Sequence, residues 1–255
     1  MDTTIFVEAF GRFLSGGYHP EEDLYSVFRA RSVLMGWYTP PQRRLSDTRV
    51  YYTSLQRGSF SPSPVSWRME EADIYEQNDA LRIATAQVGL EAGVPIVIAL
   101  PALIQCFDDS LRRFGAVELS GYQVTVSELE AVQESWLSHL SQMTNYFKVS
   151  HRSTEATLIV YELAEGPGLQ LVTELEKLST NTFRYQRTAY TAGRDASEMS
   201  PRPGVGMRKH FRLSLPEGPD AAGWAMALAL DAILTLRPGT TDARVSLTYV
   251  EPDDC

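Results

Sequence analysis

Hydrophobic patterns typical of strands and helices recur in the same order in both halves of this chain, and this order restricts the fold more than any other feature. The pattern is clearer in the second half. Alternation of apolar and polar residues predicts half-buried strands over residues 157–163, 182–191, 210–215 and 244–250. Apolar residues at helical spacing predict helices over residues 169–178 and 219–236. The order in this half is therefore strand, helix, strand, strand, helix, strand.

The first half can be interpreted in the same order. Alternation or a continuous apolar run predicts strands over residues 4–13, 32–38, 49–55, 94–100 and 118–126. Helices are expected over residues 21–30 and 102–114. We also expect an insertion at about residues 40–93, which contains a Ser/Pro loop over residues 58–66 and a helix over residues 70–89.

This order predicts an α+β fold of two tandem ferredoxin-like (βαββαβ) halves. The halves would cover residues 1–126 and 149–255, joined by an amphipathic helix over residues 127–148. Two similarities favour an internal duplication: residues 99–101 and 214–216 both end a strand before a helix, and residues 109–126 resemble residues 231–250.

Composition excludes several classes of protein. The chain has 255 residues, 44% of them hydrophobic, which is too apolar for an intrinsically disordered protein. No apolar run approaches the roughly 20 residues of a membrane span, so no membrane partner is expected. The two cysteines, Cys106 and Cys255, do not suggest a disulfide framework, and a cytoplasmic location is expected. Basic residues comprise 20 arginines and only 3 lysines, as GC-rich bacterial codons would produce.

Charge is segregated along the chain. The net charge is −9 and the pI is about 5.0, which disfavours general binding to nucleic acid. Residues 29–68, however, hold seven arginines against one aspartate, and residues 184–212 hold seven basic residues against two acidic ones. Aromatic residues are interleaved in both stretches, so each could bind an anionic ligand. The candidate ligand-binding residues are Arg43, Arg44, Arg49, Tyr51, Arg184, Tyr185, Arg208 and His210. Alternatively, these arginines balance acidic residues on the helices.

Residues with catalytic or metal-binding potential are scattered. None of the four histidines, His19, His139, His151 and His210, has a metal-ligand spacing. The acidic clusters at residues 21–23, 70–73 and 108–109 are interpreted as helix starts or solvated helix faces, and residues 203–206 as a turn. The sequence therefore predicts no metal and no cofactor, and it favours a protein that is not an enzyme.

The leading functional hypothesis is a non-enzymatic bacterial cytoplasmic binding or assembly protein, such as an accessory, adaptor or immunity-type subunit. Its expected partner is another protein or a second copy of itself, contacted through the acidic helical surface at residues 21–23 and the insertion. One alternative is an enzyme or ligand-binding protein with a pseudo-dimeric barrel around a pocket for an anionic or aromatic ligand. A third is a nucleic-acid-binding subunit that uses the two basic stretches.

Overall fold

The computed structural model describes residues 3–14, 23–34, 67–75, 82–90, 96–128, 153–161, 189–192, 208–216, 218–236 and 242–250. These residues form an α+β structure, as the sequence predicts. The strands are β1 (Thr3–Phe13), β2 (Trp67–Ile74), β3 (Arg82–Leu90), β4 (Val117–Ser127), β5 (Ser153–Tyr161), β6 (Ala189–Ala192), β7 (Arg208–Pro216) and β8 (Ala243–Tyr249). The helices are α1 (Leu24–Leu34), α3 (Ile96–Leu111) and α6 (Pro219–Leu236).

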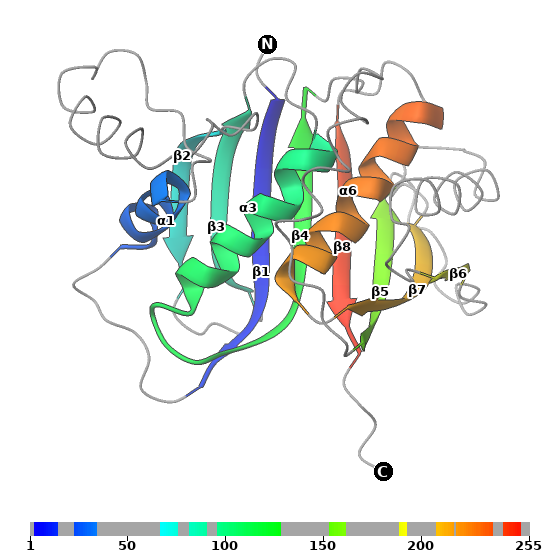
Figure 1. The fold of residues 1–255 in the computed structure, drawn as a ribbon. Coiled ribbons are helices and arrows are strands. Elements are labelled where there is room, and N and C mark those ends of the chain that lie inside the picture. The colour runs from blue at the N-terminus through cyan, green and yellow to red at the C-terminus, as the bar shows by residue number, and fades with distance from the viewer. Residues whose placement is uncertain are drawn as a thin grey trace, which may run out of the picture.

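The described strands form one sheet in the order β2-β3-β1-β4-β8-β5-β7-β6 (Figure 1). Each pairing between these strands is antiparallel. The β4–β8 pair joins the strands of the first half of the chain to those of the second, with Val124 opposite Val245. The described strands lie side by side with β2 and β6 at the two edges, so they do not close into the barrel of the alternative hypothesis.

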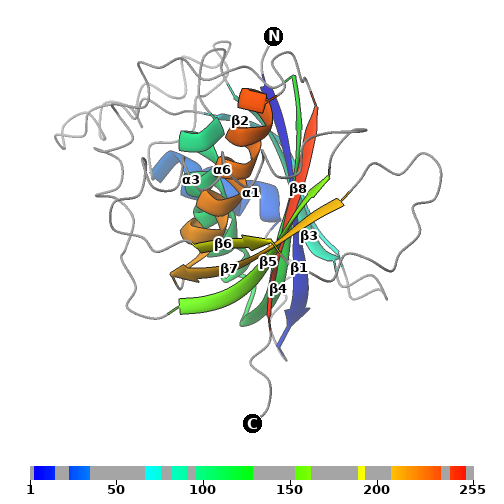
Figure 2. The ribbon, with the colours of Figure 1, turned by 90° about the vertical axis from the view of Figure 1, so that its right-hand side faces the viewer.

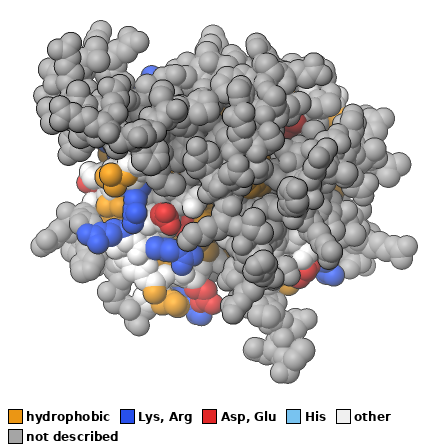
Figure 3. Space-filling model, viewed as in Figure 1, with side chains coloured by type: hydrophobic (Ala, Val, Ile, Leu, Met, Phe, Trp, Pro, Cys, Tyr) orange, Lys and Arg blue, Asp and Glu red, His pale blue; other side chains and the backbone are white. Residues whose placement is uncertain are grey.

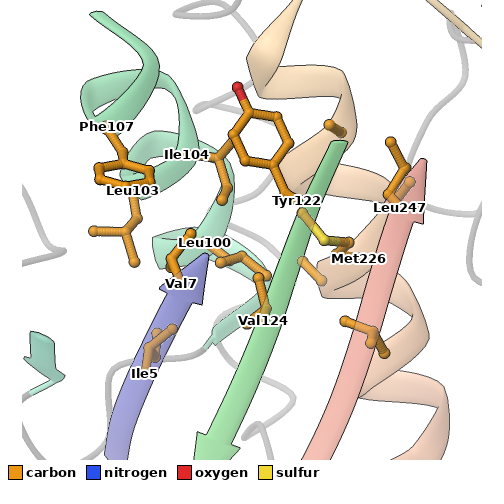
Figure 4. Close-up of a cluster of buried hydrophobic side chains, with 14 of the residues drawn as sticks. Ile5, Val7, Leu100, Leu103, Ile104, Phe107, Tyr122, Val124, Met226 and Leu247 are labelled. Carbon is orange, nitrogen blue, oxygen red and sulfur yellow. The ribbon is translucent and has the colours of Figure 1, made fainter. Parts of the chain in front are cut away.

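Helices α1, α3 and α6 all lie on one face of this sheet (Figures 1 and 2). The core lies between the helices and the sheet, where Ile5 and Val7 of β1 meet Leu100 and Leu103 of α3 (Figure 4). All four residues are fully buried. Burying one such side chain contributes roughly 1.5–3 kcal/mol. Seen from the helix side, basic and acidic side chains are interspersed where the described residues reach the surface (Figure 3).

Helices α3 and α6 cross at very short range because a glycine lies at the contact. A Cβ atom added to Gly223 of α6 would lie 2.6 Å from the Cα of Pro101 in α3 and 3.1 Å from the carbonyl oxygen of Leu100. Only a residue without a side chain allows the two backbones to approach so closely. The contact packs the helix of the first half directly against the helix of the second.

Two polar clusters inside the helical layer are satisfied by hydrogen bonds. The Trp67 indole of β2 donates to Ser32 Oγ of α1 at 3.1 Å, and the same oxygen lies 3.5 Å from the Cys106 sulfur of α3. Burial raises the pKa of the Cys106 thiol to about 12. In the second cluster, the Tyr122 hydroxyl of β4 donates to Asp108 at 3.0 Å. These bonds tie β2 to α1 and β4 to α3.

Most elements predicted in the described part of the chain are confirmed. The helix over residues 219–236 is α6, and the strands over residues 4–13, 118–126, 210–215 and 244–250 are β1, β4, β7 and β8 with slightly different ends. The helix over residues 21–30 corresponds to α1, and the strand over residues 157–163 corresponds to β5, which begins at Ser153.

The predicted helix over residues 70–89 is wrong, because residues 67–74 and 82–90 form β2 and β3. A shift in register between Met69 and Glu71 interrupts the alternation of β2, so its period of two is hidden in the sequence. Strand β3 alternates Ala84, Ala86 and Val88 on the helix side with Thr85 and Gln87 on the other side, but alanine and glutamine also favour a helix, so its composition hides the strand. Part of the predicted insertion therefore belongs to the sheet.

Two further predicted strands are wrong. Residues 32–34 of the predicted strand 32–38 continue α1, where the Ser32 hydroxyl donates to the Phe28 carbonyl one turn earlier. Residues 96–100 of the predicted strand 94–100 form the first turns of α3. The sequence predicts that Pro101 ends a strand, but Pro101 lies inside this helix. A buried run of β-branched residues is compatible with a strand or with a helix when the segment is packed on all sides.

Several predicted elements lie outside the described residues: the linking helix beyond residue 128, the helix over 169–178, the strand over 49–55, the loop over 58–66 and most of the strand over 182–191. Ser127 belongs to β4 rather than to the linking helix. None of the described helices combines the length and the hydropathy that crossing a membrane requires.

Candidate functional site

The structure describes two of the predicted ligand-binding residues, Arg208 and His210, and places both on β7. The others, Arg43, Arg44, Arg49, Tyr51, Arg184 and Tyr185, lie outside the described residues. In the sheet register, Arg208 lies opposite Tyr161 of β5, and His210, which is partly buried, lies opposite Ile159. The predicted basic stretch is therefore adjacent to β5.

Strand alternation divides the sheet into two faces. Residues such as Val7, Val124 and Val245 point toward the helices and are fully buried. Their neighbours along the strands point to the opposite face, which we call the polar face. It carries charged, amide and hydroxyl groups in its centre, and Arg244 of β8 and Arg212 of β7 are exposed on it. The described helices leave this face uncovered (Figure 2).

A line of hydrogen bonds crosses the centre of the polar face. Arg82 of β3 donates to Glu8 Oε1 of β1 at 2.9 Å, and Gln123 of β4 donates to Glu8 Oε2. Gln123 Oε1 in turn accepts a hydrogen bond from Arg244 of β8 at 2.5 Å. We call these four residues, Arg82, Glu8, Gln123 and Arg244, the polar line. It crosses the β4–β8 junction and so connects the two halves of the sheet.

The Glu8 carboxylate is the most deeply buried charge in the polar line, with 11% of its side chain exposed. A buried carboxylate is costly unless it is paired and hydrogen-bonded, and here each of its oxygens accepts one bond. The bond to Glu8 raises the pKa of Arg82 above its usual range. This arginine therefore stays protonated at any physiological pH.

Each end of the polar line has an arginine stacked on a tyrosine. The Arg244 guanidinium lies 4.8 Å from the centre of the Tyr161 ring, and the Tyr161 hydroxyl lies 3.3 Å from Ser246 Oγ. At the other end, Arg82 lies 4.5 Å from the ring of Tyr75, whose hydroxyl lies 3.1 Å from Thr85 Oγ1. Such contacts fix the plane of the guanidinium.

The two ends differ in charge. At one end the Arg82 charge is compensated by Glu8, and the neighbouring edge strand β2 carries exposed Glu71 and Asp73. At the other end Arg244 is held by a neutral amide and forms no ion pair with any described residue. The polar face is therefore acidic at β2, whereas over β8, β5 and β7 two exposed arginines, Arg244 and Arg212, outnumber the exposed Glu155.

This arrangement suits recognition of an anion better than proton transfer. A general acid or base needs a pKa close to the working pH, whereas the pKa of Arg82 is raised above its usual range and the Gln123 amide does not titrate. A guanidinium held in a fixed plane beside an aromatic ring can instead pair with a carboxylate or phosphate and present a flat surface to a second ring.

The other candidate groups have structural roles or lie outside the described residues. Asp108 is buried and accepts hydrogen bonds from Tyr122 and, at 2.7 Å, from Arg112. Asp23 accepts a bond from the Ser26 backbone at 2.7 Å, which caps α1 and lowers the pKa of this carboxyl group. In the described part of the chain, no cluster of three His, Cys, Asp or Glu residues could hold a metal ion.

Sequence reasoning missed the residues of the polar line and Tyr161: Arg82, Glu8, Gln123, Tyr161 and Arg244. Glu8 interrupts the apolar stretch of β1, Tyr161 lies inside a predicted strand and Arg244 begins one, so alternation assigns each to a face but does not bring them together. Their proximity follows only from the strand order, which places β3, β1, β4, β8 and β5 side by side.

Comparisons with known proteins do not identify a family. No family model matches the chain, and no curated protein matches it. Among solved structures, 3-hydroxy-3-methylglutaryl-coenzyme A reductase of Streptococcus pneumoniae aligns over 90% of this chain and 68% of its own, with 7% identity and a TM-score of 0.22. A Cas6 product complex aligns over 92% of this chain and 94% of its own, with 14% identity and a TM-score of 0.17. At these TM-scores neither similarity informs the fold or the function.

Proposed function

We propose that this protein is a non-enzymatic binding protein that recognises an anionic partner on the basic side of the polar face. The observation that carries the proposal is the Arg244 guanidinium, which stacks 4.8 Å from the Tyr161 ring and is held in place by Gln123. Because the binding group is already fixed, little side-chain entropy is lost when an anion pairs with it. The predicted residues Arg208 and His210 lie on β7, which pairs with β5 beside this group.

We propose in addition that the chain is an internal duplication of two ferredoxin-like halves, residues 1–126 and 149–255, joined by residues 127–148. From the central β4–β8 pair outward, the strands run β4-β1-β3-β2 on one side and β8-β5-β7-β6 on the other. Each series is the fourth, first, third and second described strand of its half, which supports the duplication. The contact between α3 and α6, the helices that precede the fourth described strand of each half, fits the same arrangement.

The proposed setting is the bacterial cytoplasm. The excess of arginine over lysine and the free, buried thiol of Cys106 are both consistent with it. An acidic surface elsewhere on the chain would keep such a protein soluble while the basic strands bind the partner.

Binding of two labelled polyanions, heparin and polyglutamate, tests the proposed function. We expect at least one of them to bind the full chain and Arg244→Glu to weaken that binding about tenfold or more, because it places a negative charge beside the anion. Arg31→Glu is the matched control, since Arg31 is exposed on α1 on the opposite side of the sheet. Equal losses for both variants, or no binding of either probe, would contradict the proposal.

A further inference from the structure

We infer that the anionic partner is a single-stranded nucleic acid, with its backbone paired to Arg244 and a base stacked beside Tyr161. This inference rests on the proposed function and adds the chemical class of the ligand. It depends on three features of the basic side of the polar face: an aromatic ring, a fixed guanidinium and a row of further basic residues.

The first feature is that one group offers both kinds of contact that a nucleotide needs. A nucleotide carries a negative charge and a flat ring in each repeating unit, and proteins bind it by pairing arginine with the phosphate and stacking an aromatic side chain on the base. Tyr161 is partly buried, and its hydroxyl is held close to Ser246, so its ring is fixed in the surface. An acidic peptide would pair with the guanidinium and would not need the aromatic ring.

The second feature is that no described residue forms an ion pair with Arg244. Its partner Gln123 accepts a hydrogen bond without neutralising the guanidinium, whereas Arg82 at the other end of the polar line is neutralised by Glu8. A phosphate would therefore be attracted to the β8–β5 side of the polar line. The acidic residues on β2 would repel it from the other side.

The third feature is that basic residues occupy further positions on the strands that neighbour Tyr161. Arg208 lies opposite Tyr161 in the register and Arg244 lies opposite it on the other side, so arginines flank the tyrosine on both neighbouring strands. Further along β7, Arg212 is exposed opposite Thr157. A row of basic residues across adjacent strands fits a flexible single strand, which can follow the curved surface of a sheet better than a rigid duplex can.

The whole chain is titrated against fluorescein-labelled single-stranded RNA and DNA of about 12 nucleotides, with fluorescence anisotropy as the readout. We expect binding that weakens as salt is added. Arg244→Gln should weaken it about tenfold and reduce the slope of log affinity against log salt by about one. Tyr161→Leu should weaken it about tenfold with the slope unchanged, because stacking is lost and charge is not.

Arg68→Gln is the matched control, because Arg68 is an exposed arginine on β2 of the same sheet, 3.2 Å from Glu70. It should change the affinity less than about twofold. Circular dichroism of each variant confirms that it folds. A loss of the same size for Arg68→Gln as for Arg244→Gln, or an unchanged affinity for Tyr161→Leu, would overturn the inference.

The failure of this inference is distinguishable from the failure of the proposed function. If neither oligonucleotide binds but polyglutamate does, and Arg244→Glu abolishes that binding, the partner is an acidic protein segment and only the nucleic-acid assignment is overturned. If the oligonucleotides, polyglutamate and heparin all fail to bind, both proposals are wrong.

Discussion

Replacing Gly223 by alanine tests how the two halves of the helical layer meet. In an ordinary helix interior the change from glycine to alanine stabilises the protein by about 1 kcal/mol. Here the new methyl group would lie 2.6 Å from the Cα of Pro101 and 3.1 Å from the carbonyl oxygen of Leu100. Both atoms belong to the backbone and cannot rotate away, so α3 and α6 must move apart.

Overpacking a buried contact in this way costs about 1–3 kcal/mol, and we expect the upper part of that range because the obstructing atoms are rigid. After subtraction of the gain in helix propensity, the net loss is about 2 kcal/mol. For a protein of this size that corresponds to a fall in Tm of about 4–8 °C. Thermal unfolding followed by circular dichroism, with urea unfolding as a second measurement, gives both quantities.

Gly89→Ala is the control for this prediction. A Cβ atom at Gly89 would lie 3.1 Å from Glu70 Oε1 and 3.4 Å from a terminal nitrogen of Arg68, which are the ends of flexible side chains. The Tm of this variant should change little. A higher Tm for Gly223→Ala, as an unpacked helix would give, would refute the close crossing of α3 and α6.

Three further predictions concern groups with defined partners. Asp23→Ala removes the cap of α1 and should cost about 1 kcal/mol at neutral pH. The pKa of Asp23 is lower in the folded protein than in the unfolded chain, so its carboxylate stabilises the fold above the unfolded pKa near 3.8, and this stabilisation is lost as the pH falls. The free energies of unfolding of variant and parent, measured with urea, should therefore converge at acidic pH. In a Cys255→Ser background, Cys106 should react with Ellman's reagent only after denaturation, since its pKa is about 12 and it is buried; rapid reaction of the native protein would contradict this. Tyr122→Phe removes a hydrogen bond to the buried Asp108 carboxylate and should lower the unfolding free energy by about 2 kcal/mol; an unchanged value would show that this bond is not formed.

The α+β class could be predicted from the sequence because several single segments show a clear helical or strand periodicity of apolar residues. Most of the eighteen residues of α6 are apolar, and β8 alternates regularly, so the sequence predicts both elements correctly. Strand β3 alternates as well, with Ala84, Ala86 and Val88 between Thr85 and Gln87, but alanine and glutamine are good helix formers. Composition therefore favours a helix there over the period of two.

The candidate site was only partly predictable for a different reason. The basic character of residues 184–212 is visible in the sequence, and it led to Arg208 and His210. The partners of the polar line come from strands far apart in the chain: Glu8 meets Gln123, and Gln123 meets Arg244. Such contacts depend on which strands are neighbours, and residue patterns within one strand carry no information about that.

Amide hydrogen exchange of the full chain, with and without a bound single-stranded oligonucleotide, tests most directly the claim that the polar face is the binding surface. We expect slower exchange in peptides from β5, β7 and β8, and no change in peptides from α3 and α6 on the opposite face. Protection confined to the helices, with β5, β7 and β8 unchanged, would contradict the claim.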